Sequence, residues 1–417
     1  MIKINNKQNH YIFTSVLTLI SLMLCRDWYI DTTRLFNIDF FNLFILAIFI
    51  SMTFYQLYEW LALRNEVSNG TKISLLDNRD RMYNIEFLRV VFTIGVLTSH
   101  FFNKLGLCNF GWLGVMFFFM VSGFFLNLTF SPQKSVGAIV KKRICQFIPL
   151  IICGSFLHIL FIHYISIPDM VAEFLLMTST GLYTHARYNC VSWYISVLFW
   201  VSIFYFYLIK TKSKENVNIF LAIISFLGLI AMIKRGMAWQ NTLGDKGDLG
   251  FVFDMRFVYG LATIAIGYFI AEIFKMINSD KIISSTEKTV YTLMEMFFIC
   301  YNVLIMFIKP MYPRNIGIVA FCYASMILLF VLKRGYISQF LEKKIWAIPA
   351  KYCLATYLVQ SITTLSIFDW AVKKYPLLLT EYKGFTIFAT LFICITLGVW
   401  AHHVIEKPCG KFLKKVL

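Results

Sequence analysis

The chain has 417 residues, of which 59% are hydrophobic and only 15% are charged, and its mean hydropathy is +0.69. This composition excludes a soluble globular protein, because apolar runs of about 17 or more residues recur along the chain and such runs cross a bilayer as helices. The formal net charge of +17 does not indicate nucleic-acid binding, since the basic residues lie in short loops between the apolar runs and report membrane topology. The sequence therefore predicts an all-α, polytopic transmembrane helical bundle.

The hydropathy pattern predicts about twelve membrane spans. In chain order they cover roughly 11–25, 40–62, 84–103, 111–129, 145–165, 192–209, 218–233, 255–274, 290–308, 316–332, 349–367 and 384–404. The first two spans form an N-terminal membrane hairpin (1–62), residues 63–83 form a cytoplasmic linker, and residues 84–417 form a ten-helix core. The excess of Lys and Arg in alternate loops places both termini in the cytoplasm, and the chain in the cytoplasmic (inner) membrane.

The span 84–103 carries two ionisable residues, Arg89 and His100. Eleven helical steps separate them, which is a rise of roughly 16 Å and a return to within about 20° of the same helix face. A charged residue inside the bilayer is expensive, so the pair indicates a functional site in which the two side chains face one groove at two depths. The alternative is that Arg89 snorkels to one interface and His100 lies at the other.

Two further segments contain residues that suit a ligand. Ser122 and Gly123 interrupt an aromatic run, and small residues let either a neighbouring helix or a ligand chain approach the backbone closely. Lys142 and Arg143 precede the span 145–165. They can hold the phosphate groups of a cytosolic ligand, or they follow the positive-inside rule and contact anionic lipids.

Trp193 and Tyr194 open the span 192–209, where they form either an interfacial aromatic belt or a platform for a sugar ring. The ten cysteines contain no Cys-x-x-Cys pair, and the histidines lack metal-ligand spacing, so no metal site is predicted. Cys108 and Cys190 both fall in loops predicted to lie on the outer side of the membrane, opposite the cytoplasm, which makes a disulfide between them a hypothesis.

Taken in this order, the motifs resemble the acyltransferase 3 family of membrane O-acyltransferases, of the bacterial polysaccharide and O-antigen O-acetyltransferase type. The resemblance covers about 84–415 and rests on the spacing of Arg89 and His100, the Ser-Gly-Phe in an aromatic helix, the basic cluster before a proline, the Trp-Tyr pair and a closing Glu-Lys-Pro at Glu406. The chain departs from the family pattern at Gln146, where a second Arg is common, and at Gln360, where a His is common.

The resemblance implies transfer of an acetyl or other small acyl group from a cytosolic acyl-CoA, usually acetyl-CoA, to a hydroxyl of an envelope glycan such as O-antigen lipopolysaccharide or another surface polysaccharide, free or lipid-linked. It implies that His100 acts as the general base or carries a covalent acyl group. The residues that it implies for donor binding are Arg89, Lys142, Arg143, Ser122 and Gly123. Trp193 and Tyr194 would contact the acceptor or the thioester, and the partners are the acyl-CoA, the glycan and membrane lipids.

The competing interpretation is a transporter or permease for a glycan or a lipid-linked sugar, in which Arg89 contacts the substrate or relays protons. Transporters often contain inverted repeats and paired broken helices, and the sequence shows neither. Covalent movement of acetyl groups onto glycan distinguishes the two functions.

Overall fold

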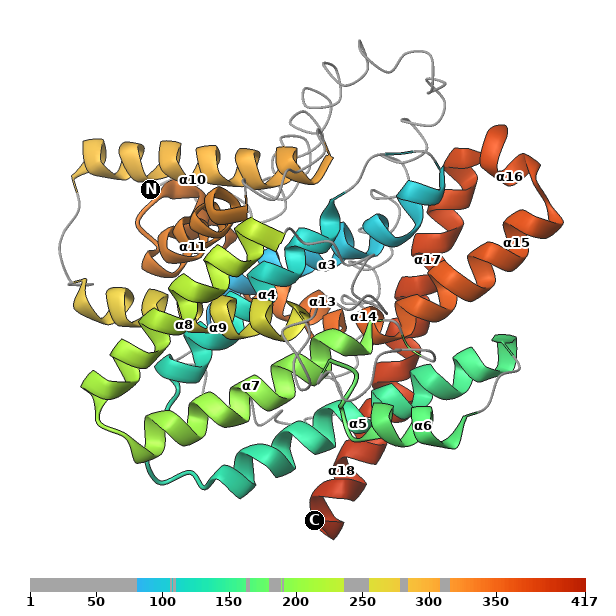
Figure 1. The fold of residues 1–417 in the computed structure, drawn as a ribbon. Helices are drawn as coiled ribbons and strands as arrows, with labels where there is room; N and C mark the ends of the chain where they lie inside the picture. The colour runs from blue at the N-terminus through green and yellow to red at the C-terminus, as the bar shows by residue number, and fades with distance from the viewer. Residues whose placement is uncertain are drawn as a thin grey trace, which may run out of the picture. The chain divides into compact units, whose positions relative to one another are not determined.

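The structure is a computed structural model that describes residues 81–105, 107, 110–162, 166–179, 189, 191–235, 255–277, 284–307 and 316–417. Every regular element in these ranges is a helix, as the sequence predicts (Figure 1). The predicted spans 11–25 and 40–62, most of the predicted linker, and Cys108 and Cys190 lie outside the described residues.

The long helices are α3 (Tyr83–Phe102), α4 (Gly114–Leu128), α5 (Val136–Ile162), α7 (Ser192–Thr211), α8 (Lys214–Arg235), α9 (Met255–Met276), α10 (Ser285–Phe307), α11 (Ile316–Leu332) and α17 (Lys383–Ala401). The short helices are α6 (Ile167–Phe174), α12 (Tyr336–Leu341), α13 (Ala347–Ala350), α14 (Cys353–Ser361), α15 (Phe368–Lys374), α16 (Leu377–Thr380) and α18 (Lys407–Val416). Two π-helical segments, η6 (Ile362–Ile367) and η7 (His402–Glu406), and three 3₁₀ turns, η2 (Asn103–Leu105), η3 (Gly111–Leu113) and η5 (Lys344–Trp346), complete the described elements.

Six helical segments in the described ranges are long and apolar enough to cross a membrane, namely α3, α7, α8, α9, α10 and Lys383–Val416. The apolar helices α4 and α11 are shorter. The chain is therefore a multi-pass membrane protein with six to eight candidate spans in its described part, fewer than the twelve expected. Two expected spans fall outside the described residues, and the expected span 349–367 is divided among α13, α14 and η6.

The chain divides into two compact units. The larger comprises Asp80–Trp370 and Ile393–Leu417, and the smaller includes Ala371–Phe392. Within the smaller unit, the hydroxyl oxygen of Thr386 lies 2.9 Å from the carbonyl oxygen of Leu378, which ties the start of α17 to α16. All further features belong to the larger unit.

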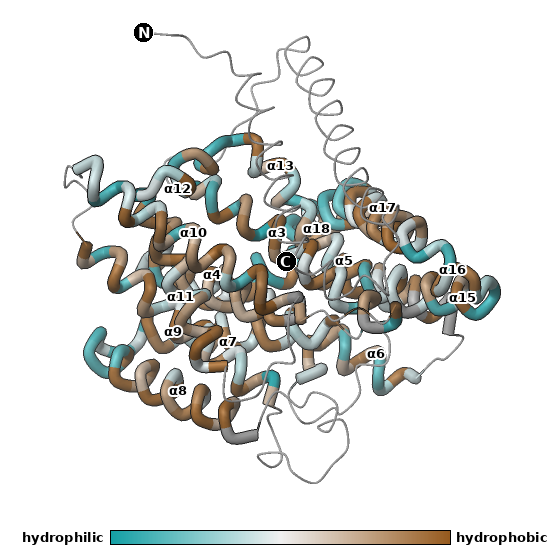
Figure 2. Tube along the Cα trace, turned by 90° about the horizontal axis from the view of Figure 1, so that it is seen from above, coloured by the Kyte–Doolittle hydropathy of each residue, from teal (hydrophilic) through white to brown (hydrophobic). Residues whose placement is uncertain are grey.

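In the larger unit, α3 and α9 are interior helices, whereas α8 and α10 are peripheral. In α3 and α9, 61% of the most apolar 18-residue stretch is buried, but in α8 and α10 only 22% of that stretch is buried. Large apolar side chains such as Ile223, Phe226 and Leu227 are exposed on α8, whose apolar character runs along the helix in Figure 2. A helix that is apolar on its exposed face suits contact with lipid, because the backbone is satisfied within the helix and the side chains need no water.

Helices α4 and α9 pack closely, side by side in Figure 1, because glycine removes a side chain from each helix at the contact. A Cβ atom on Gly123 would lie 1.9 Å from the carbonyl oxygen of Ile264, and one on Gly267 would lie 2.0 Å from that of Met120. Small residues at such a crossing bring the backbones together and increase dispersion contacts.

We expect Gly123→Ala to lower the thermal stability of the protein, because its methyl group would overlap the backbone of α9 and push the helices apart. Overpacking of this kind destabilises by about 1–3 kcal/mol. Gly137→Ala in α5 is the matched control, since its Cβ would lie 3.9 Å from the Ser135 hydroxyl oxygen. Thermal unfolding of the detergent-solubilised variants measures the effect, and equal midpoints for the two would contradict it.

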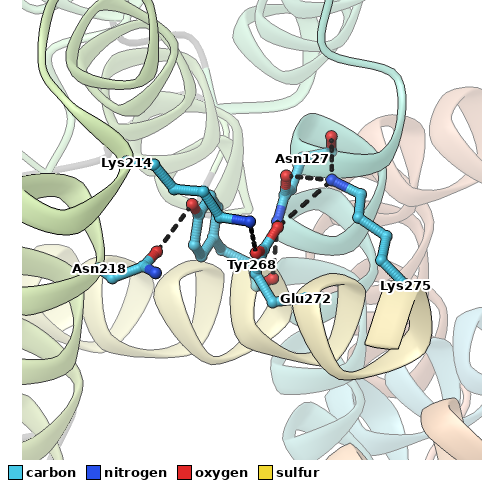
Figure 3. Close-up of polar contacts among 6 residues, drawn as sticks. All are labelled: Asn127, Lys214, Asn218, Tyr268, Glu272 and Lys275. Carbon is cyan, nitrogen blue, oxygen red and sulfur yellow. Dashed lines mark hydrogen bonds and ion pairs between the residues drawn. The ribbon is translucent and has the colours of Figure 1, made fainter. Parts of the chain in front are cut away.

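One end of the α4–α9 pair carries a polar network that also includes α8 (Figure 3). The Asn127 amide, which is 6% exposed, donates to the Glu272 carboxylate at 2.9 Å, and Lys275 donates to the Asn127 side-chain oxygen at 2.7 Å. Lys214 of α8 pairs with the other Glu272 oxygen at 2.6 Å. Each of these polar groups therefore has a partner, and the network links α4, α8 and α9 to one another.

The C-terminal helix α18 packs against α5 near a proline. Pro149 has no N–H to donate, so the Cys145 carbonyl four residues earlier lacks its helical hydrogen bond. Gly410 of α18 lies at this carbonyl, where a Cβ would be 3.0 Å from the oxygen. The contact aligns the basic helix α18 with the first turns of α5.

The start of α3 is anchored by hydrogen bonds to α11, α12 and the turn after α12. The buried Asn84 amide donates to the Phe330 carbonyl at 2.7 Å, and its backbone N–H donates to the Glu342 carboxylate at 3.0 Å. Lys333 pairs with the same carboxylate at 2.8 Å. These bonds hold the N-terminal turn of α3, and so position Arg89 one to two turns further on.

Candidate functional site

Arg89 and His100 lie on one uninterrupted helix, α3. The Arg89 guanidinium donates to the Glu86 carboxylate at 2.7 Å, one turn earlier, and its side chain is 33% exposed. Arg81 donates to the other Glu86 oxygen at 3.2 Å from a more exposed position. Because a guanidinium has five N–H donors, Arg89 keeps several for a ligand while Glu86 orients it.

Four predicted site residues from four helices meet around the phenol of Tyr194. The guanidinium groups of Arg89 and Arg143 both lie within electrostatic reach of this phenol, and the Ser122 hydroxyl is within hydrogen-bonding reach of it. Tyr194 is only 7% exposed. We call Arg89, Ser122, Arg143 and Tyr194 the Tyr194 cluster; it places two cations and two hydroxyls in one region of the bundle.

Local contacts orient the α4 and α5 members of the cluster. The Arg143 guanidinium lies over the ring of Phe147, 5.5 Å from its centroid, one helical turn further along α5. Such cation–π stacking directs the planar fork without using its donors. Ser122 donates its hydroxyl to the Phe118 carbonyl at 2.8 Å, so its oxygen remains able to accept a hydrogen bond.

Aromatic rings surround the Tyr194 side chain. Its ring centroid is 4.8 Å from that of Phe119 and 5.2 Å from that of Tyr357 in α14. Trp193, which is 9% exposed, lies 6.2 Å from Phe119. The Tyr357 hydroxyl donates to the Val191 carbonyl at 3.1 Å, which ties α14 to the start of α7. This rigid wall excludes water and strengthens the charge interactions beside it.

Two of the residues assigned to donor binding lie outside the Tyr194 cluster. Gly123 faces α9 at the close helix contact, which accounts for the glycine by packing, whereas Ser122 contributes to the cluster. Lys142 is exposed and lies near Arg143, Lys134 and Lys414 of α18, a group of like charges. Lys142 therefore adds positive potential beside Arg143. The described cations that interact electrostatically with the Tyr194 phenol are Arg89 and Arg143.

His100 lies at the opposite end of α3 from Arg89, partly exposed and close to Lys104. Lys104 itself pairs with Asp369 and donates to the Thr364 carbonyl at 3.3 Å. Within the described part of the chain, the His100 imidazole has no hydrogen-bond partner, so no carboxylate there orients it as in a catalytic triad.

A histidine–carboxylate pair that the sequence analysis did not single out lies in η7. His402 Nδ1 is 2.7 Å from the Glu406 carboxylate, while His402 Nε2 is buried without a hydrogen bond to any residue that the structure describes. The Tyr352 ring contacts the rings of both His402 and His403, and its hydroxyl lies 3.1 Å from His403 Nε2. The signal in the sequence is the four-residue spacing of His402 and Glu406, which places the two side chains one helical turn apart. π-helical turns of this kind often occur at functional sites.

The fold and the cluster define a multi-pass membrane protein that carries cations, hydroxyls and an available imidazole inside a helical bundle. The sequence matches the family model described as an acyltransferase domain over residues 82–404, most of the chain. The chain belongs to the acyltransferase 3 family and is a membrane acyltransferase, which confirms the resemblance inferred from its motifs. No curated protein and no solved structure matches it.

Proposed function

We propose that the protein transfers an acetyl group from cytosolic acetyl-CoA to a hydroxyl of an envelope glycan, and that this glycan is an O-antigen or another surface polysaccharide repeat, free or lipid-linked. The observation that carries the proposal is the convergence of Arg89, Arg143, Ser122 and Tyr194, with His100 on the same helix as Arg89. The chain lies in the cytoplasmic membrane with its termini inside, an orientation supported by the basic helix α18.

The donor binds from the cytoplasmic side. Arg143, stacked on Phe147, and the exposed Lys142 form the mouth of the site, where cations attract the phosphates of CoA. Arg89 lies further along and holds a phosphate or the polar pantetheine arm with the donors that Glu86 leaves available. The Ser122 and Tyr194 hydroxyls lie where the arm and its thioester pass.

The acceptor reaches His100 from the outer side. A sugar hydroxyl is a poor nucleophile at neutral pH, and an imidazole that titrates near 6.5 when unperturbed suits the removal of its proton. In the direct reaction His100 takes the hydroxyl proton, the oxygen forms a bond to the acyl carbon, the carbon–sulfur bond breaks, and CoA leaves as the thiolate. In the alternative reaction a His100 ring nitrogen attacks the acyl carbon, the carbon–sulfur bond breaks and CoA leaves as the thiolate; the sugar oxygen then attacks that carbon, the carbon–nitrogen bond breaks, and the hydroxyl proton passes to the released imidazole. Trp193 and Tyr194 contact the sugar or the thioester.

The test is transfer of labelled acetyl from acetyl-CoA into glycan in membranes with and without the protein. We expect label in a glycan fraction only when the protein is present, and separation of the labelled glycans identifies the acceptor. Absence of label across several glycan backgrounds, with the protein well inserted, would contradict the proposal. Labelled sugar that crosses the membrane without becoming acetylated would instead indicate transport.

Arg143→Ala is expected to raise the KM for acetyl-CoA, because it removes a stacked guanidinium from the donor's path. A hydrogen bond to a charged group is worth about 1.5–3 kcal/mol, so the increase should be about 10- to 100-fold. Lys288→Ala is a matched control, since Lys288 lies over the ring of Tyr336 at 4.2 Å. An equal KM for both variants would remove Arg143 from the donor site.

A further inference from the structure

A carboxyl group is buried where α5, α6 and α7 meet. Glu173, in the last turn of α6, is 0% exposed, and neither of its carboxyl oxygens has a hydrogen-bond partner among the described residues. Ser155 of α5 is 1% exposed, and its hydroxyl also lacks a partner in this part of the chain. Helices α5 and α6 pack together beside each other in Figure 1. Buried polar groups are almost always hydrogen-bonded, so two unpaired groups at one junction require an explanation.

Two of the three groups around Glu173 belong to residues that are held in place by other contacts. Ser155, the Ser192 hydroxyl and the Asn189 backbone N–H lie close enough to act on the carboxyl, but none forms a hydrogen bond of normal geometry with it. The Asn189 amide donates to the Leu358 carbonyl of α14 at 3.0 Å, and the Ser192 hydroxyl is 3.5 Å from that of Thr178. Asn189 and Ser192 are therefore anchored beside the carboxyl without forming a hydrogen bond to it, and the Ser155 hydroxyl is unpaired, an arrangement that suits a small polar ligand.

This junction borders the Tyr194 cluster. Ser192 immediately precedes Trp193 and Tyr194 on α7. Asn189 bonds α14 at Leu358, next to Tyr357, whose ring is 5.2 Å from that of Tyr194. A group bound at Glu173 thus lies next to the aromatic wall of the candidate site, and it lies in the connection between α5 and α7 rather than in a membrane-spanning helix.

The chemistry of the junction selects a neutral ligand. Among the residues that the structure describes, the one charged group whose electrostatic effect reaches the Glu173 carboxyl is Asp169 on the same helix, and no described cation of α5 or α7 does so. An anionic phosphate or carboxylate would therefore be repelled. A carboxyl group with serine hydroxyls and a backbone N–H offers both donors and acceptors, which is the complement of a sugar hydroxyl.

We propose that Glu173, with Ser155 and Ser192, forms a subsite that binds a hydroxyl of an uncharged sugar in the acceptor glycan. The proposal rests on the proposed acyl transfer to a glycan. Glu173 is a positioning residue: it orients the sugar ring while His100 acts on the reacting hydroxyl. The protonated carboxyl donates to the sugar oxygen and accepts from a serine hydroxyl, so that each unpaired group acquires a partner.

The protonation state of Glu173 supports this role. Burial raises the pKa of Glu173 to about 7, against the opposing effects of Ser192, the Asn189 N–H and Ser155, and the like charge of Asp169 raises it further. The carboxyl is therefore neutral and able to donate below this pH, and becomes a buried anion above it. Because the neutral form is the one that donates to the sugar, acceptor binding should weaken as the pH rises through about 7.

The test is the pH profile of acetyl transfer from labelled acetyl-CoA to membrane glycan, from about pH 6 to about pH 8.5. We expect wild-type transfer to decline on the alkaline side, and Glu173→Gln, which keeps a neutral donor, to lose that decline. Glu173→Ala and Ser155→Ala should each transfer about tenfold more slowly near pH 6 with an unchanged KM for acetyl-CoA. Asp169→Asn is the control: it should keep the alkaline decline but move it to lower pH, because it removes a like charge that raises the pKa of Glu173.

The outcomes separate this subsite from the overall function. An active wild type whose alkaline decline persists in Glu173→Gln, or whose rate is unchanged in both Glu173→Ala and Ser155→Ala, would overturn the subsite and leave acyl transfer in place. A rise in the KM for acetyl-CoA in the alanine variants would also overturn it, because it would assign the junction to the donor. A wild type that transfers no acetyl at any pH would overturn the proposed function, and the subsite with it.

Discussion

His100→Ala is expected to reduce acetyl transfer by about 10²- to 10⁴-fold, the contribution of a general base in many enzymes. The imidazole is partly exposed, and it has no hydrogen-bond partner within the described residues, so its loss leaves no buried polar group among them unpaired. The variant should therefore insert and fold normally while the rate falls. The measurement is the initial rate of label transfer from acetyl-CoA to glycan, normalised to the amount of protein in the membrane.

His403→Ala provides the matched control for His100→Ala. His403 is exposed at the other end of the described chain, and its ring contacts the Tyr352 hydroxyl at 3.1 Å. We expect this variant to keep most of the transfer rate. If His100→Ala were as active as His403→Ala, His100 would be neither the base nor the acyl carrier.

The same variant separates the direct and the covalent reactions. If His100 carries the acetyl group, wild-type protein incubated with labelled acetyl-CoA but without acceptor should retain label, and His100→Ala should not. If His100 acts only as a base, neither protein retains label. Either result is consistent with the loss of transfer in His100→Ala. Retention of label by the wild-type protein therefore distinguishes the covalent from the direct reaction, and does not test whether His100 is needed.

Arg89→Lys is expected to reduce kcat/KM for acetyl-CoA by about 10- to 100-fold, although it keeps the positive charge. Arg89 uses one end of its guanidinium on Glu86 at 2.7 Å and is 33% exposed, so its remaining donors reach toward the site. A lysine can keep the ion pair with Glu86 but lacks the planar fork that binds a phosphate or an amide at two points. Steady-state kinetics with varied acetyl-CoA measure the effect.

Arg81→Lys is the control, because Arg81 contacts the same Glu86 carboxylate at 3.2 Å from a side chain that is 43% exposed. Changing it alters the charge environment of Glu86 as little as Arg89→Lys does, and it removes no donor from the Tyr194 cluster. We expect an almost unchanged kcat/KM. Equal losses in the two variants would show that the ion pair with Glu86, rather than the fork of Arg89, determines donor use.

The class of the protein follows from the sequence because it depends on local properties. Apolar runs long enough for a bilayer indicate membrane spans wherever they occur, and helical periodicity alone places Arg89 and His100 on one face of one helix. The structure contains that helix as α3, and the family match agrees with the motifs. The number of spans was harder to predict, since hydropathy does not show that the segment around Cys353 divides into several short helices.

The composition of the site was decided by tertiary packing. Ser122 and Gly123 are neighbours in sequence, but successive helical residues point about 100° apart, so Ser122 lies at Tyr194 while Gly123 contacts α9. Arg143 reaches the same phenol from α5, which no spacing in the sequence indicates.

The sequence by itself therefore determined that this is a helical membrane protein with an arginine and a histidine on one helix face, because hydropathy and helical period act within single segments, and the resemblance of its motifs to a family indicated an acyltransferase. Only the tertiary structure decided that Arg143 joins Arg89 at Tyr194 and that Glu173 is buried without a partner. The physical reason is that charge interaction, burial and hydrogen bonding depend on distances between separate helices, and those distances arise only when the helices pack.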